Sequence, residues 1–183
     1  MRNGAAGELG LLALALSCFA GPVAGQENPF QISFIGPTMQ LVDDDEDVRG
    51  IRLNLIYGVN EDVAGLDVGL INHVNGDMTG FGLGLLNVTD GDVTGWQAGL
   101  VNVAQGDLTG IQFSGGALAN FARAAEGAQI AWALNRAEEI RGFQLSLVNI
   151  ADDMHGIQVG LINIIRSKPD LWILPLVNWK LDD

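Results

Sequence analysis

Glycine recurs along this chain at an interval that dictates a repeated structure. The recurring positions are Gly50, Gly65, Gly80, Gly95, Gly110, Gly127, Gly142 and Gly156, which are spaced by 15, 15, 15, 15, 17, 15 and 14 residues. The clearest units read GLDVGLINHVNGDMT, GFGLGLLNVTDGDVT and GWQAGLVNVAQGDLT, and copies follow in GFQLSLVNIADDMH and GIQVGLINII. Self-similarity at a fixed period is stronger evidence of fold than any single motif. We therefore expect one supersecondary unit for each copy.

Each unit is typical of β structure. Counted from its first glycine, apolar residues occupy positions 2, 4 and 6, such as Trp96, Ala98 and Leu100. This alternation predicts a strand with these residues facing the core. Positions 7 and 9 are also apolar, so we expect a bend between positions 6 and 7 that keeps both sets in one core, with Asn102 between them. Position 14 is apolar in nearly every copy, which predicts burial there too.

The polar residues of the unit also recur. Asparagine at position 8 is typical of a corner and predicts an amide ladder if copies stack; it is present as Asn72, Asn87, Asn102, Asn149 and Asn163. A carboxylate at position 13 is typical of a turn closed on backbone N–H groups. It recurs as Asp47, Asp62, Asp77, Asp92 and Asp107, and later as Glu139 and Asp153.

Two architectures fit a 15-residue β unit. In a parallel β-solenoid each unit is one coil, whereas in an up-and-down antiparallel meander each unit is one strand and a turn. A meander places successive turns at opposite ends and predicts a period of two units, but the copies look equivalent. The apolar residue in every presumed turn and the Asn row also favour the solenoid. We therefore expect an all-β fold, a parallel β-solenoid of about eight 15-residue coils.

The antiparallel alternative stays open from the sequence. Residues 29–41, 51–59, the repeats and residues 171–179 could form about ten strands of an outer-membrane β-barrel. Against it, the tryptophans and the single tyrosine do not fall at one repeat position that would build interfacial girdles, and no long extracellular loops are evident.

The rest of the chain divides into segments of different character. Residues 1–25 are expected to be a secretory signal peptide, because Arg2 precedes an apolar run that ends at Pro22. Residues 26–49 form an N-terminal segment with an acidic loop, residues 50–165 hold the 15-residue repeats, and residues 166–183 are expected to cap the open end. Lipidation of Cys18, in place of simple cleavage, stays open.

The repeat is irregular in one place. Around residues 114–126 the register slips by two and alanine replaces the β-branched pattern, which indicates a bulged coil or a short helical insertion. Over residues 114–135 the pattern is interrupted, and Asn120 and Asn135 are expected to fall out of register. The acidic run at residues 43–47 is more typical of a solvated loop than of a calcium site.

Composition excludes several classes of function. The formal net charge is −13, so no basic stripe can neutralise phosphates, and binding to nucleic acid is disfavoured. The one cysteine lies in the leader, which excludes disulfides and cysteine-ligated metals from the mature chain. His73 and His155 occupy different repeat positions without a ligand spacing. We therefore name no catalytic, cofactor-binding or metal-binding residues and expect no cofactor.

The row of aspartates allows one enzymatic hypothesis. Asp77, Asp92 and Asp107 could line a carbohydrate-cleaving groove if they stack on one face. Catalysis needs two special carboxylates and not a row, so the pattern disfavours a glycan-active enzyme. We expect a protein that is not an enzyme.

The motif GφQφGLφN, where φ is apolar, is visible at residues 95–102 and again at residues 156–163. It resembles the repeats of the leptospiral surface-repeat lipoproteins and similar Bacteroidetes proteins, over roughly residues 50–178. The resemblance implies a surface or envelope location and brings no catalytic residues. The sequence thus predicts an exported, non-enzymatic protein of the periplasm, outer membrane or cell surface with a structural or interaction role. Its partner and oligomeric state cannot be read from the sequence.

Overall fold

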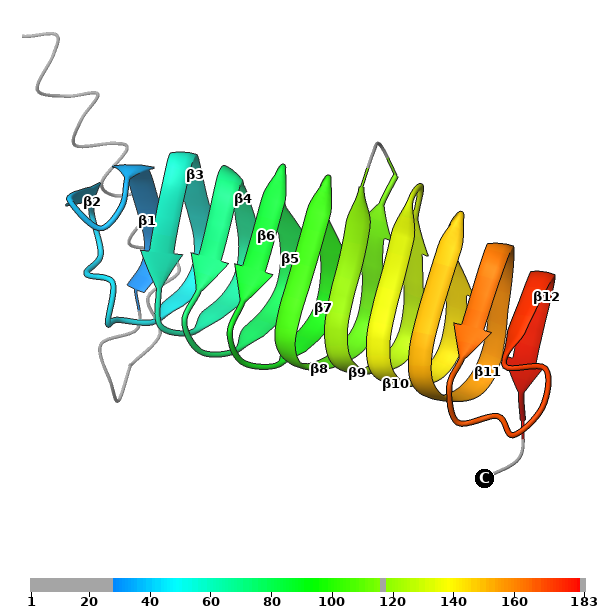
Figure 1. The fold of residues 1–183 in the computed structure, drawn as a ribbon. Helices are drawn as coiled ribbons and strands as arrows, with labels where there is room; N and C mark the ends of the chain where they lie inside the picture. The colour runs from blue at the N-terminus through cyan, green and yellow to red at the C-terminus, as the bar shows by residue number, and fades with distance from the viewer. Residues whose placement is uncertain (1–27, 116–117, 182–183) are drawn as a thin grey trace, which may run out of the picture.

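The computed structural model describes residues 28–115 and 118–181 and is a parallel β-solenoid (Figure 1). The expected signal peptide and Cys18 lie outside the described residues. Eight stacked glycines bound about seven complete turns, which confirms the predicted fold class. The strands are β1 (Asn28–Ile35), β2 (Met39–Gln40), β3 (Val48–Asn60), β4 (Val63–Val74), β5 (Met78–Leu83), β6 (Leu86–Thr89), β7 (Val93–Ala98), β8 (Val101–Ser114), β9 (Ala119–Ala131), β10 (Leu134–Leu145), β11 (Val148–Ile165) and β12 (Ile173–Lys180).

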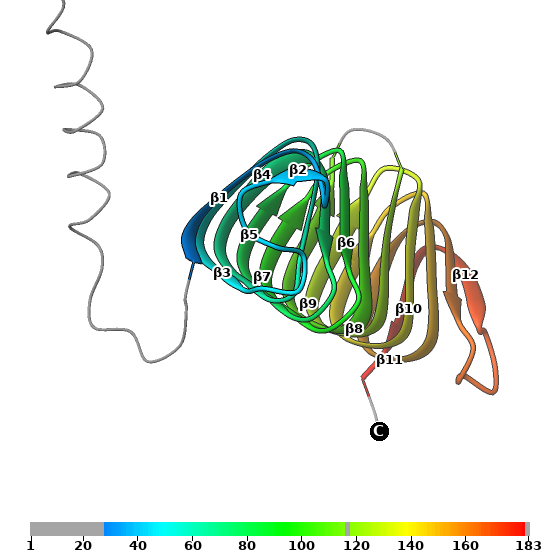
Figure 2. The same ribbon diagram turned by 90° about the vertical axis from the view of Figure 1, so that its left-hand side faces the viewer.

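Equivalent residues of successive coils lie side by side. Gly65 of β4 pairs with Gly80 of β5, and this continues through Gly95 of β7 to Gly110 of β8. Seen obliquely along the stack, the coils appear as a series of similar loops, each displaced from the one before it (Figure 2). β3 to β11 pair in parallel, so the up-and-down antiparallel alternative is wrong for the repeats.

The period of 15 has a steric origin in the first glycine of each unit. These glycines have φ between +126° and +155°, a conformation that L side chains rarely adopt. A Cβ on Gly95 would lie 2.1 Å from the carbonyl oxygen of Gly80 in the preceding coil. Glycine is therefore required here by both the backbone conformation and the close approach of neighbouring coils.

The alternation of each strand has the opposite phase to the one expected. Trp96 at position 2 is 49% exposed and Leu85 at position 6 is 50% exposed, whereas Gln97 and Asn102, at positions 3 and 8, are fully buried. The prediction that positions 2, 4 and 6 face the core is wrong, and positions 7 and 9 lie half-buried on the outside. The physical reason is that a buried amide can bond to its copy in the next coil, so a row of amides is tolerated inside.

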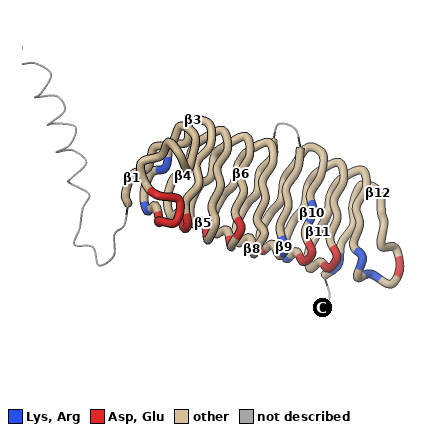
Figure 3. The backbone as a smooth tube through the Cα atoms, turned by 60° about the vertical axis from the view of Figure 1, so that its left-hand side comes forward, with Lys and Arg blue, Asp and Glu red and all other residues tan. Residues whose placement is uncertain are grey.

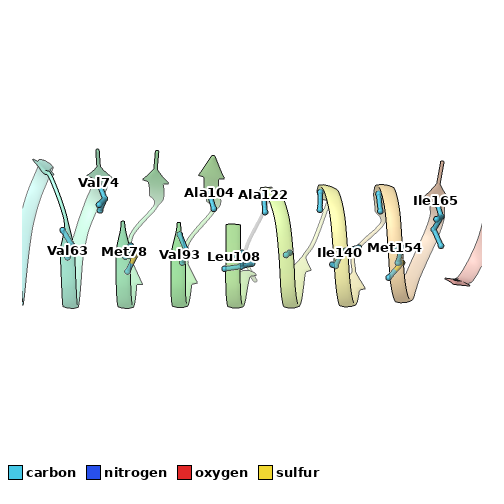
Figure 4. Packing of buried hydrophobic residues seen from close by; sticks show 13 residues of the cluster. Val63, Val74, Met78, Val93, Ala104, Leu108, Ala122, Ile140, Met154 and Ile165 are labelled. Carbon is cyan, nitrogen blue, oxygen red and sulfur yellow. The ribbon is translucent and has the colours of Figure 1, made fainter. Parts of the chain in front are cut away.

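The hydrophobic core occupies only part of the interior. It consists of two rows, one from position 14 and one from position 10 (Figure 4). The first row holds Val63, Met78, Val93, Leu108, Ala125, Ile140 and Met154, as predicted for position 14. The second holds Val74, Ala104, Ala122, Ala137, Ala151 and Ile165. These rows face each other across the coil, and their burial stabilises the stack by removing apolar surface from water.

The register slip lies between Ser114 and Ala119, and the pairing shifts back by one residue between Ala104 and Asp107. Ser114 pairs with Ala131, and after residues 115–118 the ladder resumes with Ala119 opposite Val101. The segment from Ala119 is strand β9, so the helical alternative is wrong for the described residues there. Asn120 pairs with Asn102 and also with Asn135. The expectation that these two asparagines leave the register is wrong, because the insertion precedes them.

Both ends of the stack are closed by additional strands. At the start, β1 pairs in parallel with β3, and the short β2 returns antiparallel to β1. At the other end, β12 pairs antiparallel with β11, so residues 173–180 lie against the last coil (Figure 1). Pro175 lies in β12 and lacks an N–H, which reduces the pairing capacity of this exposed edge.

Candidate functional site

Each coil divides into two halves of opposite polarity. We call positions 5 to 7 the Leu corner, because position 6 is most often leucine, and positions 11 to 13 the Asp corner. Near the Asp corner the interior is apolar and the exterior is polar, as in an ordinary soluble protein. Near the Leu corner the interior holds glutamine, asparagine and small residues, while the exterior is apolar. The half with inverted polarity is the most unusual feature of the molecule.

The exterior of this inverted half forms a continuous apolar face. It is built from outward positions 2, 4, 6 and 7 together with Leu118. Its exposed large side chains, from Leu66 at 36% to Trp132 at 65%, are Ile51, Leu53, Leu55, Ile56, Leu66, Leu70, Phe81, Leu83, Leu85, Trp96, Phe113, Leu118, Trp132, Leu145, Leu147, Ile157, Leu161 and Ile162. Together they expose on the order of 1,000 Å², against about 300–600 Å² for the largest apolar patch of a typical soluble monomer.

Behind the apolar face run two ladders of buried amides. In the Asn ladder each Nδ2 donates to the Oδ1 of the next coil at 2.8–3.0 Å, through Asn54, Asn72, Asn87, Asn102, Asn120, Asn135, Asn149 and Asn163. In the Gln ladder each Nε2 donates to the Oε1 of the preceding coil at 2.7–2.9 Å, through Gln158, Gln144, Gln129, Gln112 and Gln97. The two ladders satisfy polar groups that would otherwise be costly to bury.

The Asp corner is held by a third row of hydrogen bonds. Oδ1 of Asp62 accepts the backbone N–H of Asp77 at 2.7 Å, and the same bond follows from Asp77 to Asp92 and from Asp92 to Asp107. The prediction that these carboxylates close a turn on backbone N–H groups is confirmed, with the N–H coming from the next coil. The row is therefore engaged in holding one coil to another.

Charged side chains are kept away from the apolar face. Across the described residues, outward positions 2, 4, 6 and 7 carry no Asp, Glu, Lys or Arg. Figure 3 shows acidic and basic residues gathered along the edge of the Asp corner and in the loop between β2 and β3, while the opposite edge is mostly free of colour. The solenoid is thus amphipathic across its width and uniform along its length.

One ion pair lies inside the coils. Arg52 and Asp67, at the position that later coils give to glutamine, form a bidentate pair with distances of 2.8 and 2.7 Å. Both side chains are essentially inaccessible to water. Arg52 also donates to the backbone oxygen of His73 at 2.9 Å and to Asn60 Oδ1 at 3.3 Å. These bonds satisfy the guanidinium, so the pair acts as a substitute for the Gln ladder.

A short chain of polar groups lies on the outer surface of the arm that holds position 9. The Tyr57 hydroxyl lies 3.0 Å from Nδ1 of His73, whose Nε2 lies 3.2 Å from Asp90 Oδ2. Burial raises the pKa of the Tyr57 phenol, so the hydroxyl stays protonated at neutral pH and is a poor nucleophile. These three side chains therefore hydrogen-bond to one another on the surface, and Tyr57 is not an activated nucleophile.

The apolar face is hollowed at its N-terminal end. A cavity of about 940 Å³ opens there between β2 and the outward side chains of the first coils. Its lining is largely apolar and includes Phe34, Met39, Leu41, Leu53 and Leu70. It is an extension of the apolar face and has the dimensions of a site for a ligand of small-molecule size.

Comparison with known proteins identifies no relative, so the function has to be inferred from the physical character of the apolar face. No family model, curated protein or solved structure matches this chain. Among residues 28–115 and 118–181 there is no helix long and apolar enough to cross a membrane. In the same part of the chain no group of three or more His, Cys, Asp or Glu side chains is placed to hold a metal ion.

The structure separates the chemical groups that the sequence singled out. The carboxylates of Asp77, Asp92 and Asp107 stand in one row at the Asp corner, bound to backbone as described above. His73 joins the polar chain at position 9, and His155 lies in the outward position before Gly156, so the two are not brought together. The acidic run at residues 43–47 lies between β2 and β3, and its last residue joins the Asp corner, because Asp47 Oδ1 accepts the backbone N–H of Asp62 at 3.2 Å.

Sequence reasoning missed the apolar face because it placed the same side chains in the core. The signal that could have found it is that position 3 is glutamine in every copy from Gly95 onward, and position 8 is asparagine in five of the eight copies. A polar position on a solvated surface ordinarily accepts Lys, Glu, Asp or Ser, whereas a ladder position needs one kind of amide. A recurring single amide type therefore indicates the inside of a solenoid.

Proposed function

We propose that this chain is an exported, non-enzymatic protein of the cell envelope that works by binding an apolar partner through its apolar face. The observation that supports the proposal is the continuity of that face over all the coils together with the exclusion of charge from it. Leaving on the order of 1,000 Å² of apolar surface in water is unfavourable by about 25 cal/mol for each Å². A covered face removes this penalty, so the chain is suited to an interface and not to free solution.

A glycan-cleaving role gains nothing from the arrangement at the Asp corner. Cleavage of a glycoside requires two carboxylates in different environments on either side of one bond. Asp77 and Asp92 have the same environment, since each accepts one backbone N–H from the next coil at 2.7 Å. The row accordingly has a structural explanation that needs no substrate.

The proposal is tested by locating the full chain in a bacterium that expresses it. The variant Leu85→Glu with Leu147→Glu places two charges on the apolar face, at positions that are 50% and 38% exposed. Its control, Thr79→Glu with Thr94→Glu, places two charges on exposed sites of β5 and β7 outside the face. Wild type and control should sediment with the envelope, and the Leu variant should move to the soluble fraction. An unchanged distribution of the Leu variant, or a cytosolic wild type, would contradict the proposal.

A further inference from the structure

We propose that the partner of the apolar face is lipid hydrocarbon, so that the solenoid lies edgewise in one leaflet of a membrane with its Leu corner in the acyl chains and its Asp corner in water. This inference rests on the proposed function and specifies the occupant of the same face.

The first argument concerns hydrogen bonding. A segment in hydrocarbon must satisfy all its polar groups internally. In the Leu-corner half the backbones pair coil to coil through parallel ladders, and the amides of positions 3 and 8 bond to their own copies. The outward side chains there offer almost no hydrogen-bonding group. A protein partner would be expected to meet about one hydrogen bond for each 100–200 Å² of interface, which this face cannot supply.

The second argument concerns depth. From position 2 to position 6 the chain advances four residues into the Leu corner, which is at most about 13 Å at a rise of about 3.3 Å per residue. One leaflet of the hydrocarbon core is about 15 Å thick, half of about 30 Å. The apolar part of the coil thus has the height of a single leaflet. The Asp corner carries the charges at the opposite edge, where water can solvate them.

The third argument concerns aromatic side chains. Phe81, Trp96 and Phe143 occupy position 2, at the boundary between the apolar and polar halves, and Trp179 of β12 pairs beside Ile157 at the same level. Tryptophan and tyrosine concentrate at membrane interfaces because their amphipathic rings suit the headgroup region, and Trp96 and Trp179 lie at this level. Trp132 lies instead at the Leu corner, 65% exposed, where it would be the deepest tryptophan.

The fourth argument separates lipid from a second copy of the chain. The face repeats with every coil and changes little along the stack, whereas a pair of identical chains needs specific self-complementary features at one place. In a contact between two copies of the chain, the hollow of about 940 Å³ between β2 and the first coils would stay unfilled, whereas flexible acyl chains can fill it. The hollow is lined by Phe34, Met39 and Leu41, and these apolar side chains suit hydrocarbon.

The test uses residues 26–183, which contain every described strand and the whole core, with vesicles of zwitterionic phosphatidylcholine. The protein should float with the vesicles in a density gradient and keep its β circular dichroism. Flotation should persist in high salt, because the face carries no charge to be screened. The variant Leu85→Glu with Leu147→Glu should stay at the bottom of the gradient, and Thr79→Glu with Thr94→Glu should float.

Orientation is read from two proteins that keep one tryptophan each, Trp96 or Trp132, with the others changed to Phe. In vesicles of brominated lipid, Trp132 should lose most fluorescence when bromine lies near the end of the acyl chain, and Trp96 when bromine lies near the headgroup. Equal quenching at both depths, or no flotation of folded wild type, would overturn the lipid assignment, as would a stable dimer that buries the face in buffer. If flotation fails while the Leu variant still leaves the envelope fraction in cells, a protein partner replaces lipid and the proposed function stands.

Discussion

The Asn ladder can be tested by removing one rung. Asn87 is buried and takes part in three hydrogen bonds: it donates to Asn102 Oδ1 at 2.8 Å and to Ala98 O at 3.1 Å, and it accepts from Asn72 at 2.9 Å. Asn87→Ala removes all three at about 1 kcal/mol each, so the free energy of unfolding should fall by about 3 kcal/mol. This is a large part of the total of about 5–15 kcal/mol that is usual for a domain.

The assay is urea unfolding followed by far-UV circular dichroism, with wild type and variants under identical conditions. Asn75→Ala is the matched control, because Asn75 is exposed and its amide makes one long hydrogen bond, 3.4 Å to Asp44 O. Its unfolding free energy should change by less than about 0.5 kcal/mol. If Asn87→Ala is as stable as this control, the amide ladder does not stabilise the interior and the reasoning behind the inverted half is refuted.

Three further predictions concern the other rows and the cap. Gly95→Ala should prevent folding, because a Cβ there would lie 2.1 Å from a carbonyl of the preceding coil, and a wild-type circular dichroism spectrum would contradict this. Arg52→Gln should lower the unfolding free energy by about 3–5 kcal/mol by leaving Asp67 buried without its cation. Urea unfolding should show that the double variant Arg52→Gln with Asp67→Gln recovers most of that free energy. If the double variant is destabilised as much as Arg52→Gln alone, the explanation is refuted. The hydrogen bond from Lys180 holds the pKa of Asp153 at about 2, below its ordinary 3.8. The ionised Asp153 therefore stabilises the fold at pH values above 3.8, and this stabilisation is lost as the pH falls through about 2. The difference in melting temperature between wild type and Asp153→Asn should shrink over that range, and a constant difference would count against it.

The repeat, the parallel stack and the stacking of Asn72, Asn87 and Asn102 could be predicted from the sequence, because each depends on spacing alone. Spacing places equivalent residues side by side whatever direction they face. The burial of position 14 was also predictable, since Met78 and Val93 recur where a hairpin would expose them.

The direction of the alternation could not be derived in the same way. An alternating strand such as Gly95–Leu100 fits either phase, and the usual assumption that apolar residues face inward selects the wrong one. That assumption holds where water is the surrounding medium, and it reverses in hydrocarbon. The stability of a polar interior also depends on hydrogen bonds between coils, such as Gln112 to Gln97, which become apparent only when copies are stacked in three dimensions.

The register slip shows a related limit. Counting residues between Gly110 and Gly127 gives 17 and suggests that the following asparagines are displaced. In the structure Ser114 pairs with Ala131 and Asn120 pairs with Asn102, so the asparagine is back in its ladder. The coil-to-coil hydrogen bonds of the Leu corner resume with Ala119 N–H to Leu100 O and Leu134 N–H to Leu118 O, so the arms on either side stay paired.

The two amide ladders point in opposite directions along the stack. Asparagine amides donate toward the C-terminal coil and glutamine amides toward the N-terminal coil, so their dipoles oppose each other. An α-helix accumulates partial charge at its ends because its dipoles align, whereas here the side-chain contributions largely cancel. Each ladder nevertheless ends in an acceptor: within the described residues, Asn54 Oδ1 and Gln158 Oε1 are buried without a hydrogen-bond partner. β1 and β12 cover the two ends of the stack, so neither acceptor meets a further amide of its ladder. Because the two rows of dipoles oppose each other, a longer stack would accumulate little partial charge at its ends from its amides.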